Sequence, residues 1–197
     1  MILHQPLPLR LLHWTHTLGL MAVLLTGLYL HHPFTLPLLR AVNLARRLHL
    51  MGVVVVYASL ALRLYYGLVV RDLGNLLFKW EDLRALPALL RYYFFLSPHK
   101  PPQGKYNAGQ KLEYTSWAVL FVLQAITGLI LYAPRALLGW TRYLGGGLVA
   151  VRWLHFGVAL YFLVTLTLHT YLVFIEDPER FKAMFSGYID PRRQPPS

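Results

Sequence analysis

The sequence predicts an all-α integral membrane protein, in which four spanning helices form one bundle and a short helix lies at the membrane surface. Of the 197 residues, 56% are hydrophobic and only 14% are charged, and the mean hydropathy is +0.45. A typical soluble domain is about 45–50% apolar and about 25% charged. Four apolar stretches reach spanning length, and the charged residues cluster between them. The whole chain, residues 1–197, is expected to form a single domain.

Each of the four apolar stretches is expected to form one helix. About 20 apolar residues are needed to cross a hydrocarbon core roughly 30 Å thick. Backbone groups in lipid must bond to one another, and a helix satisfies them within one segment. Charged residues, His or Pro stand at the ends of each stretch. The predicted helices are Leu11–His32, Leu48–Val70, Leu112–Ala133 and Val151–Ile175.

The distribution of Lys and Arg predicts the orientation of the chain. The N-terminus, the connection 71–111 and the C-terminal tail carry 12 of these residues, and the two other connections carry 6. The positive-inside rule therefore places both termini and the long connection on the cytoplasmic side of a bacterial-type inner membrane. Within that connection, the segment 83–95 combines apolar, aromatic and Arg residues, which favours a short interfacial helix.

The composition excludes several kinds of cofactor and partner. Cysteine is absent, which excludes disulfides, cysteine-ligated iron–sulfur clusters, thiolate-bound zinc and covalently attached haem in this chain. Nine His and four Met remain as soft metal ligands. The net charge of +11 and the pI near 10.1 would suit nucleic acid, but the hydropathy argues against that partner. We find no internal repeat in the sequence.

Five histidines lie inside the predicted spans, at two depths. An ionisable side chain is costly within a membrane and normally faces the bundle interior for a functional reason. His13 and His16 lie near the cytoplasmic start of the first helix, whereas His49 and His155 lie near the outer starts of the second and fourth helices. His169 follows His155 by 14 residues, which places it about 21 Å further along the same face, at the inner level.

Two histidines at each of two depths match the ligands of two stacked b haems, each iron bound by two imidazoles inside a four-helix bundle. The outer haem would be bound by His49 and His155. The inner haem would be bound by His169 together with His13 or His16. A haem-free anchor or a small-molecule transporter would leave this arrangement of histidines unexplained.

Three glycines and one arginine are placed to accommodate a haem. Gly27, Gly52 and Gly157 could let the backbone approach a flat ring, and close packing of helices explains the same glycines equally well. Arg63 lies inside the second helix, 14 residues after His49. Its guanidinium suits a haem propionate.

The segment 104–111, Gly-Lys-Tyr-Asn-Ala-Gly-Gln-Lys, leads into the third helix from the cytoplasmic side. Asn107 suits a helix N-cap and Gly109 suits a turn, and neither role needs a ligand. The amides of Asn107 and Gln110, free backbone N–H groups and the nearby carboxylate of Glu113 are also what a quinone site beside the inner haem requires. In that case Glu113 would relay protons from the aqueous side.

Five motifs in and between the predicted helices carry a resemblance to a known family. They are Arg10-Leu11-Leu12-His13-Trp14, Arg47-Leu48-His49, the run 104–111, Leu154-His155 and Leu168-His169-Thr170-Tyr171. They resemble the cytochrome b subunit of membrane-bound formate dehydrogenase, and the resemblance covers roughly residues 8–188. The resemblance implies a gamma subunit that takes electrons from an iron–sulfur subunit on the outer face and passes them through two b haems to menaquinone at the inner face. A molybdenum or tungsten catalytic subunit would be a further partner.

The resemblance also implies roles for individual residues. By position, His49 and His155 match the outer haem ligands, and His13 and His169 match the inner pair. His16 then becomes the alternative inner ligand.

The resemblance further matches Asn107 and Gly109 to residues of the quinone pocket, with His169 beside them. The tail 188–193 ends sooner than is usual in that family, which leaves the identity of the partner open. Related b-type cytochromes serve hydrogenases and other molybdoenzymes, and a stand-alone dihaem cytochrome linked to quinone is a further alternative. In each case the chain would transfer electrons and break no bonds beyond the quinone step.

Overall fold

Four long helices form the body of the molecule. The chain is described by a computed structural model for residues 2–3, 5–33, 42–71, 74, 77–99, 101, 106–144 and 146–189. Within these residues, four helices are long and apolar enough to cross a membrane, so the predicted fold class is confirmed. They are α1 (Leu7–His31), α2 (Val42–Val69), α4 (Ala108–Tyr132) and α6 (Gly147–Glu176).

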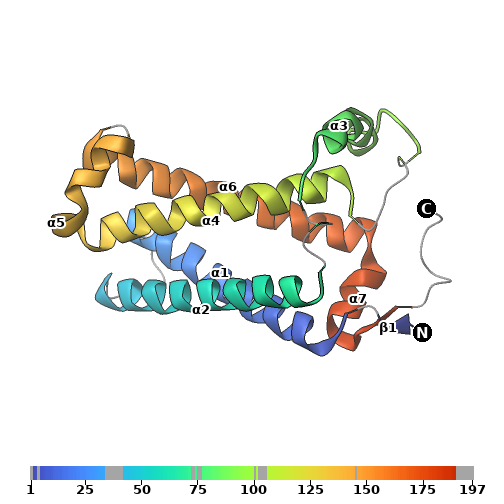
Figure 1. Cartoon of the computed structure of the whole chain (residues 1–197), viewed down its shortest axis with the longest axis horizontal. Coiled ribbons are helices and arrows are strands. Elements are labelled where there is room, and N and C mark those ends of the chain that lie inside the picture. Colours follow the sequence, from blue (N-terminus) through green and yellow to red (C-terminus); the bar gives the residue numbers. More distant parts are fainter. Residues whose placement is uncertain are drawn as a thin grey trace.

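Shorter elements lie at the two ends of the bundle (Figure 1). Helices α3 (Trp80–Tyr93) and α7 (Pro178–Ser186) lie at one end, and α5 (Pro134–Leu137) lies at the other, followed by a 3-10 helix, η3 (Leu138–Leu144). Strand β1 (Ile2–Leu3) pairs antiparallel with β2 (Tyr188–Ile189), a detail that the all-α prediction missed. The two ends of the described chain therefore lie together, beside α7.

The helices begin earlier than hydropathy predicts. The four spanning helices start at residues 7, 42, 108 and 147, four to six residues before the predicted starts. At α4 the reason is a cap, because a capped helix can begin in polar sequence outside the apolar stretch. Asn107 supplies such a cap, since its side chain accepts a hydrogen bond from the Gln110 backbone N–H. The predicted interfacial helix at 83–95 likewise begins earlier, because the Asp82 carboxylate accepts from the Lys79 backbone N–H in the first turn.

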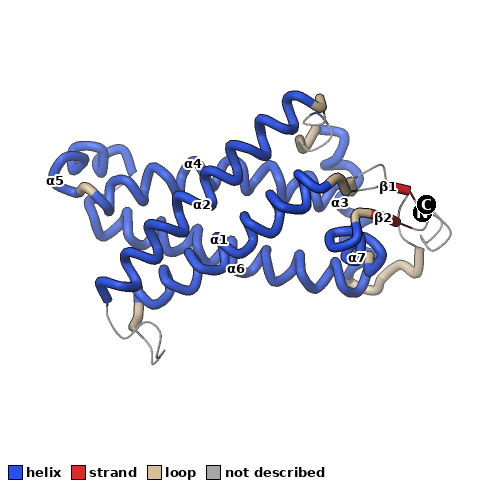
Figure 2. The backbone as a smooth tube through the Cα atoms, turned by 90° about the horizontal axis from the view of Figure 1, so that it is seen from below, coloured by secondary structure: helices blue, strands red, loops and turns tan. Residues whose placement is uncertain are grey.

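The spanning helices are arranged as two antiparallel pairs, α1 with α2 and α4 with α6 (Figures 1 and 2). The ring centroids of Phe121 and Phe162 lie 4.6 Å apart at the centre. The Tyr57 hydroxyl of α2 donates to the Phe121 carbonyl of α4 at 2.7 Å, which links the two pairs. Buried apolar residues from all four helices form the core: Leu20, Leu24, Val56, Phe121, Val158 and Phe162.

Large apolar side chains cover the outward faces of the spanning helices. Leu18, Val54, Val119 and Val164, one from each helix, are each more than 60% exposed. A soluble monomer rarely exposes so continuous an apolar surface. The outer surface of the bundle therefore fits a hydrocarbon environment.

Small residues allow α1 and α2 to approach closely. A Cβ added at Gly52 would lie 2.7 Å from Val23 Cγ2 and 3.5 Å from the Gly19 carbonyl oxygen. Gly52 therefore serves helix packing, which is one of the two roles expected for it. Gly27 instead faces His49, and no described atom lies within 4 Å of a Cβ added at Gly157.

We expect Gly52→Leu to destabilise the bundle, because the new side chain must push α1 away from α2. Overpacking costs about 1–3 kcal/mol, which corresponds to a melting temperature lower by roughly 2–12 °C in a chain of this size. The measurement is thermal unfolding of the detergent-purified protein. Ala58→Leu adds a side chain at an exposed position of the same helix and is the control. Equal melting temperatures for the two variants would contradict the close α1–α2 contact.

Candidate functional site

The structure brings the predicted histidines together in two groups, one toward each end of the bundle. His155 of α6 and His49 of α2 lie within electrostatic range of each other. Near the other end, His13 of α1 lies within electrostatic range of His169 of α6 and of His16, its neighbour on the same helix. One helix, α6, thus contributes a histidine to both groups, as the 14-residue spacing predicts.

Threonines on the neighbouring helices contact His49 and His155, the two histidines that were predicted to lie at the outer level. The His49 Nδ1 atom lies 3.1 Å from Thr26 Oγ1 of α1 and 3.1 Å from the Val23 carbonyl oxygen. The His155 Nδ1 atom lies 2.8 Å from Thr127 Oγ1 of α4. Sequence reasoning missed both threonines, because a Thr within an apolar span carries no signal of its partner.

Glycines lie against the same imidazoles. A Cβ added at Gly27 would lie 3.2 Å from His49 Cε1, and one added at Gly128 would lie 3.3 Å from His155 Cε1. Each glycine directly follows the threonine that contacts the same histidine. Gly27 was predicted to let the backbone approach a haem ring, and the ring that lies against it in the structure is the His49 imidazole. Gly128 was not predicted.

The two candidate inner ligands on α1 have different surroundings. His13 interacts with His169, as described above, and packs edge-on against the Trp14 ring. The Trp14 indole N–H donates to the Met184 carbonyl of α7 at 3.1 Å, which fixes the start of α1. His16 lies one turn further along α1, where its Nδ1 atom is 2.9 Å from Ser59 Oγ of α2. The structure therefore gives His16 a polar partner of its own.

Charged and phenolic side chains gather at the end of the bundle where α4 begins. The Tyr114 side chain of α4 interacts electrostatically with Glu113, Arg63 and Arg180, and with Tyr106. The Tyr106 and Tyr114 rings also meet edge-on, with centroids 5.5 Å apart. Arg63 of α2 thus lies within electrostatic range of Tyr114, near the start of α4. Tyr114 was not predicted, because Tyr is common at membrane interfaces.

The turn before α4 is a capping box. Asn107 Oδ1 accepts from the Gln110 backbone N–H at 2.8 Å, and Gln110 Oε1 accepts from the Asn107 backbone N–H at 3.0 Å. These bonds give Asn107 and Gln110 a structural role that needs no ligand. A Cβ added at Gly109 would lie 3.3 Å from Leu89 Cδ2, so this glycine lets α3 pack closely. The first residues of the predicted run, 104–105, lie outside the described part of the chain.

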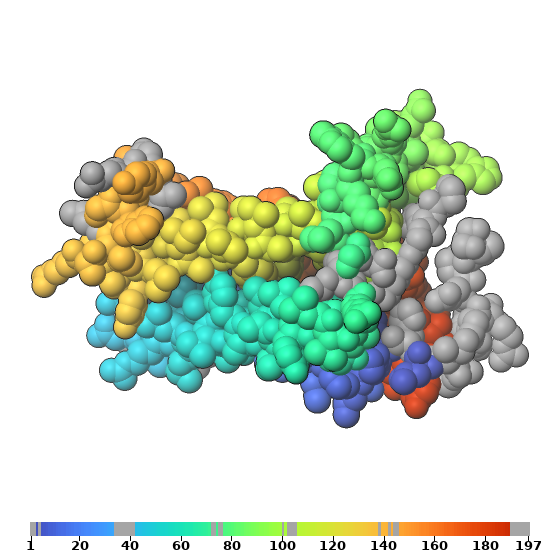
Figure 3. Space-filling view, viewed as in Figure 1, coloured from blue at the N-terminus to red at the C-terminus, as the bar shows by residue number. Residues whose placement is uncertain are grey.

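Helix α3 is joined to this turn through an ion pair. The Lys111 ammonium of α4 donates to Asp82 Oδ1 of α3 at 2.7 Å. Leu89 of α3 is buried beside Gly109, and the Tyr92 hydroxyl donates to the Glu176 carboxylate at the end of α6. Figure 3 shows α3, in green, against this end of the bundle. Helix α3 thus covers the entry to α4.

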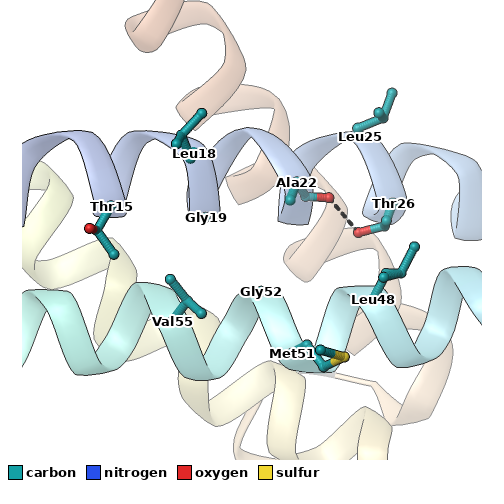
Figure 4. A pocket seen from close by; sticks show the side chains of 10 residues that line it. All are labelled: Thr15, Leu18, Gly19, Ala22, Leu25, Thr26, Leu48, Met51, Gly52 and Val55. Atoms are coloured by element: carbon teal, nitrogen blue, oxygen red, sulfur yellow. Dashed lines mark hydrogen bonds between the residues drawn. The ribbon is translucent and has the colours of Figure 1, made fainter.

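A groove of about 450 Å³ runs between α1 and α2. Its lining is apolar except for Thr15 and Thr26 (Figure 4). The Thr26 hydroxyl donates to the Ala22 carbonyl at 2.6 Å, so its hydrogen is already used. None of the predicted quinone residues, which lie on α4 and α6, lines this groove. The groove is therefore separate from the predicted quinone site.

Comparison with known proteins identifies one related family. Residues 4–187, almost the whole chain, match the family described as prokaryotic cytochrome b561. A search of curated proteins found no match. The family match agrees with the b-type cytochrome that the sequence motifs suggested, at a coarser level than the formate dehydrogenase resemblance.

We expect the contact between α3 and α4 to weaken when Asp82 loses its charge. The hydrogen bond from Lys111 lowers the pKa of the Asp82 carboxyl. A lowered pKa in the folded protein means that the stabilising contribution is complete above pH 3.8, the ordinary pKa, and is lost as the pH falls below it. Asp82→Asn should therefore speed hydrogen exchange of the α3 amides at pH 7 by about two- to five-fold.

The control for this variant is Glu81→Gln, which removes an exposed carboxylate from the same first turn of α3. It should leave exchange in α3 close to that of the unmodified protein. Equal exchange rates in the two variants would show that the ion pair does not hold α3.

Proposed function

The chain belongs to the prokaryotic cytochrome b561 family, and on this premise we propose that it carries electrons through two b haems to a quinone at the inner end of the bundle. Membership makes the chain a membrane cytochrome b and implies haem b as its cofactor. One observation chiefly supports two haems. His155 and His169, at the two levels of α6, each lie within electrostatic range of a histidine of another helix.

The residues present fit haem better than an isolated metal ion. Among the described residues, no three His, Cys, Asp or Glu side chains stand together as a metal-ion site would require. Two imidazoles at one level instead match the two axial positions of a haem iron. Gln124 Oε1, next to His155, is also buried without a hydrogen-bond partner, which suits a site completed by a further group.

Each haem would take one histidine ligand from the α1–α2 pair and one from the α4–α6 pair. His49 and His155 would hold the outer haem, while His169 and His13 would hold the inner one, with Arg63 placed for a propionate. When bound, haem b supplies an iron that accepts and releases one electron at a time. The apolar core between the two levels excludes water and keeps the ligand-bearing helices in register.

The proposed quinone site lies where α4 begins, beside His169. Arg63, Arg180 and Tyr114 provide polar groups at this end, and Asn107 with Gly109 would supply amide groups to a quinone carbonyl. Reduction of a quinone takes two electrons and two protons. Glu113, half-buried one turn inside the cap, would pass protons from the cytoplasmic side.

The partners follow from orientation and from the resemblance to formate dehydrogenase. We propose a bacterial-type inner membrane with both termini cytoplasmic, supported by the bias of Lys and Arg toward that end. Electrons would enter at the outer level from an iron–sulfur subunit served by a molybdenum or tungsten catalytic subunit. Co-purification tests this partner: a nickel-containing hydrogenase would indicate the hydrogenase alternative, and a protein that purifies without partners would indicate a stand-alone quinone-linked cytochrome.

Each haem should be lost together with its own ligands. We expect about two haems in the unmodified chain and about one in His155→Ala, because the outer iron loses an axial ligand. His13→Ala should likewise lose the inner haem, whereas His16→Ala, which removes the partner of Ser59, should keep both. The measurement is haem per chain in the purified protein.

Two results would contradict this assignment. Full haem content in His155→Ala would show that the outer pairing is wrong. Loss of a haem in His16→Ala, with both retained in His13→Ala, would make His16 the inner ligand.

The quinone site can be tested without disturbing the helix cap. Asn107→Asp keeps an oxygen that accepts from the Gln110 backbone N–H, but it loses the side-chain N–H that would donate to a quinone. We expect this variant to retain both haems and to be reoxidised by a menaquinone analogue about tenfold more slowly, with a similar or larger effect for Glu113→Gln.

Stopped-flow absorbance of the reduced haems measures this rate, and Asn43→Asp, at an exposed position near the opposite end of the bundle, is the control. Normal reoxidation in Asn107→Asp, together with poor assembly of Asn107→Ala, would show that the turn is structural and that the quinone binds elsewhere.

A further inference from the structure

The two helix pairs repeat the same contact at the outer end. In α1 the residues 25–28 read Leu-Thr-Gly-Leu, and in α4 the residues 126–129 read Ile-Thr-Gly-Leu. Thr26 contacts the histidine of its paired helix α2, and Thr127 contacts the histidine of its paired helix α6. No internal repeat was predicted from the sequence, because the similarity lies in the contacts more than in the residues themselves.

A second contact between the helices of each pair repeats ten residues further toward the other end of the bundle. His16, ten residues before Thr26, pairs with Ser59, ten residues after His49. The corresponding positions of the other pair hold Trp117 and Thr165, whose contact is a 2.9 Å hydrogen bond from the indole N–H to Oγ1. The repeat does not extend further along the helices. His169 lies 14 residues after His155 on α6, whereas the residue 14 positions after His49 on α2 is Arg63. The outer end is thus built twice from one pattern.

The hydroxyl hydrogens at the outer end are already committed to the backbone. The Thr127 hydroxyl donates to the Leu123 carbonyl at 2.8 Å, and the Thr26 hydroxyl donates to the matching carbonyl of Ala22. A hydroxyl carries one hydrogen, so each oxygen presents a lone pair to the histidine. The Nδ1 atom must then carry the imidazole hydrogen, and the Nε2 atom keeps the lone pair that a haem iron binds.

A second observation gives the same tautomer for His155. The Gln124 side-chain nitrogen lies 3.3 Å from His155 Nε2 and donates to the His155 carbonyl at 3.2 Å. An amide nitrogen is a donor only, so Nε2 faces it as an acceptor. The Nε2 atom of His155 is therefore unprotonated, as an axial ligand must be, and an iron bound there would use the lone pair that faces Gln124 and would replace this contact.

The glycine that follows each threonine makes this geometry possible. A side chain at Gly27 or Gly128 would meet the Cε1 atom of the histidine at 3.2 or 3.3 Å, which is tighter than ordinary van der Waals contact. With no Cβ, the imidazole edge can lie against the helix and its Nδ1 atom can reach the threonine. Each Thr-Gly pair therefore forms the contact site for one imidazole ring.

We propose that Thr26 and Thr127 are positioning residues of the outer haem, each fixing the tautomer and direction of one axial histidine through its Nδ1–H. This proposal rests on the proposed function, since it assigns residues that act on the ligands of that haem. Hydrogen bonding at Nδ1 also raises the basicity of the ligand and stabilises the ferric iron.

The two Thr-Gly contact sites differ in the number of acceptors that the histidine Nδ1 atom has. His49 Nδ1 has a second acceptor, the Val23 carbonyl at 3.1 Å. For His155 Nδ1, Thr127 is the acceptor that the described contacts provide. Loss of the hydroxyl should therefore matter more at Thr127 than at Thr26.

The experiment compares hydroxyl-free and hydroxyl-bearing variants of the full chain. In Thr127→Val we expect a higher midpoint potential for the outer haem, shifted ferric g values in electron paramagnetic resonance, and about 10-fold to 100-fold weaker haem retention. Thr26→Val should shift the potential in the same direction by less. Thr127→Ser keeps the hydroxyl and should restore the behaviour of the unmodified protein. The inner haem should be unchanged throughout.

Thr167→Val is the matched control, because Thr167 is an exposed residue of α6 whose hydroxyl donates to the Leu163 carbonyl of its own helix. An unshifted potential and unchanged g values in Thr127→Val would overturn the proposal while leaving the haem count intact. Equal haem loss in Thr127→Val and Thr127→Ser would also overturn it, because the hydroxyl would then be irrelevant. An unmodified chain without haem would overturn the proposed function as well.

Discussion

A polar ring inside a membrane must find its hydrogen-bond partners within the protein, and the rest of this structure depends on that constraint. Water is absent from the hydrocarbon core, so an unpaired imidazole N–H there carries a large free-energy cost. His49 and His155 meet this requirement through threonines on the neighbouring helices. The pairing of α1 with α2 and of α4 with α6 therefore orients the rings as well as packing the chain.

The two ends of the bundle differ in chemical character. At the outer end, the same Thr-Gly contact site occurs twice, and the imidazoles there lie beside threonine hydroxyls. The repeat is absent at the inner end. His13 lies 13 residues before Thr26, whereas the residue 13 positions before Thr127 is Tyr114, and Arg63 of α2 stands at the position that His169 has in α6. Tyr114 lies there within electrostatic range of Glu113, Arg63 and Arg180. This asymmetry suits electron entry at a symmetric site and proton-coupled chemistry at the other end.

The sequence predicts those features that depend on spacing and hydropathy. Four spans, an interfacial helix and two levels of histidine follow from apolar length and from the 14 residues between His155 and His169. The helix starts were predicted late, because caps such as Asn107 lie in polar sequence outside the apolar window. The Thr26 and Thr127 contacts could not be predicted, since a hydroxyl finds its histidine only after two helices have packed in register.

Haem content together with electron paramagnetic resonance of the oxidised, unmodified protein would test the assignment of two haems with two histidine ligands each. We expect about two b haems per chain and two low-spin ferric signals, because each iron would have two imidazole ligands. One haem per chain, or a high-spin signal from an iron with an open axial position, would contradict it.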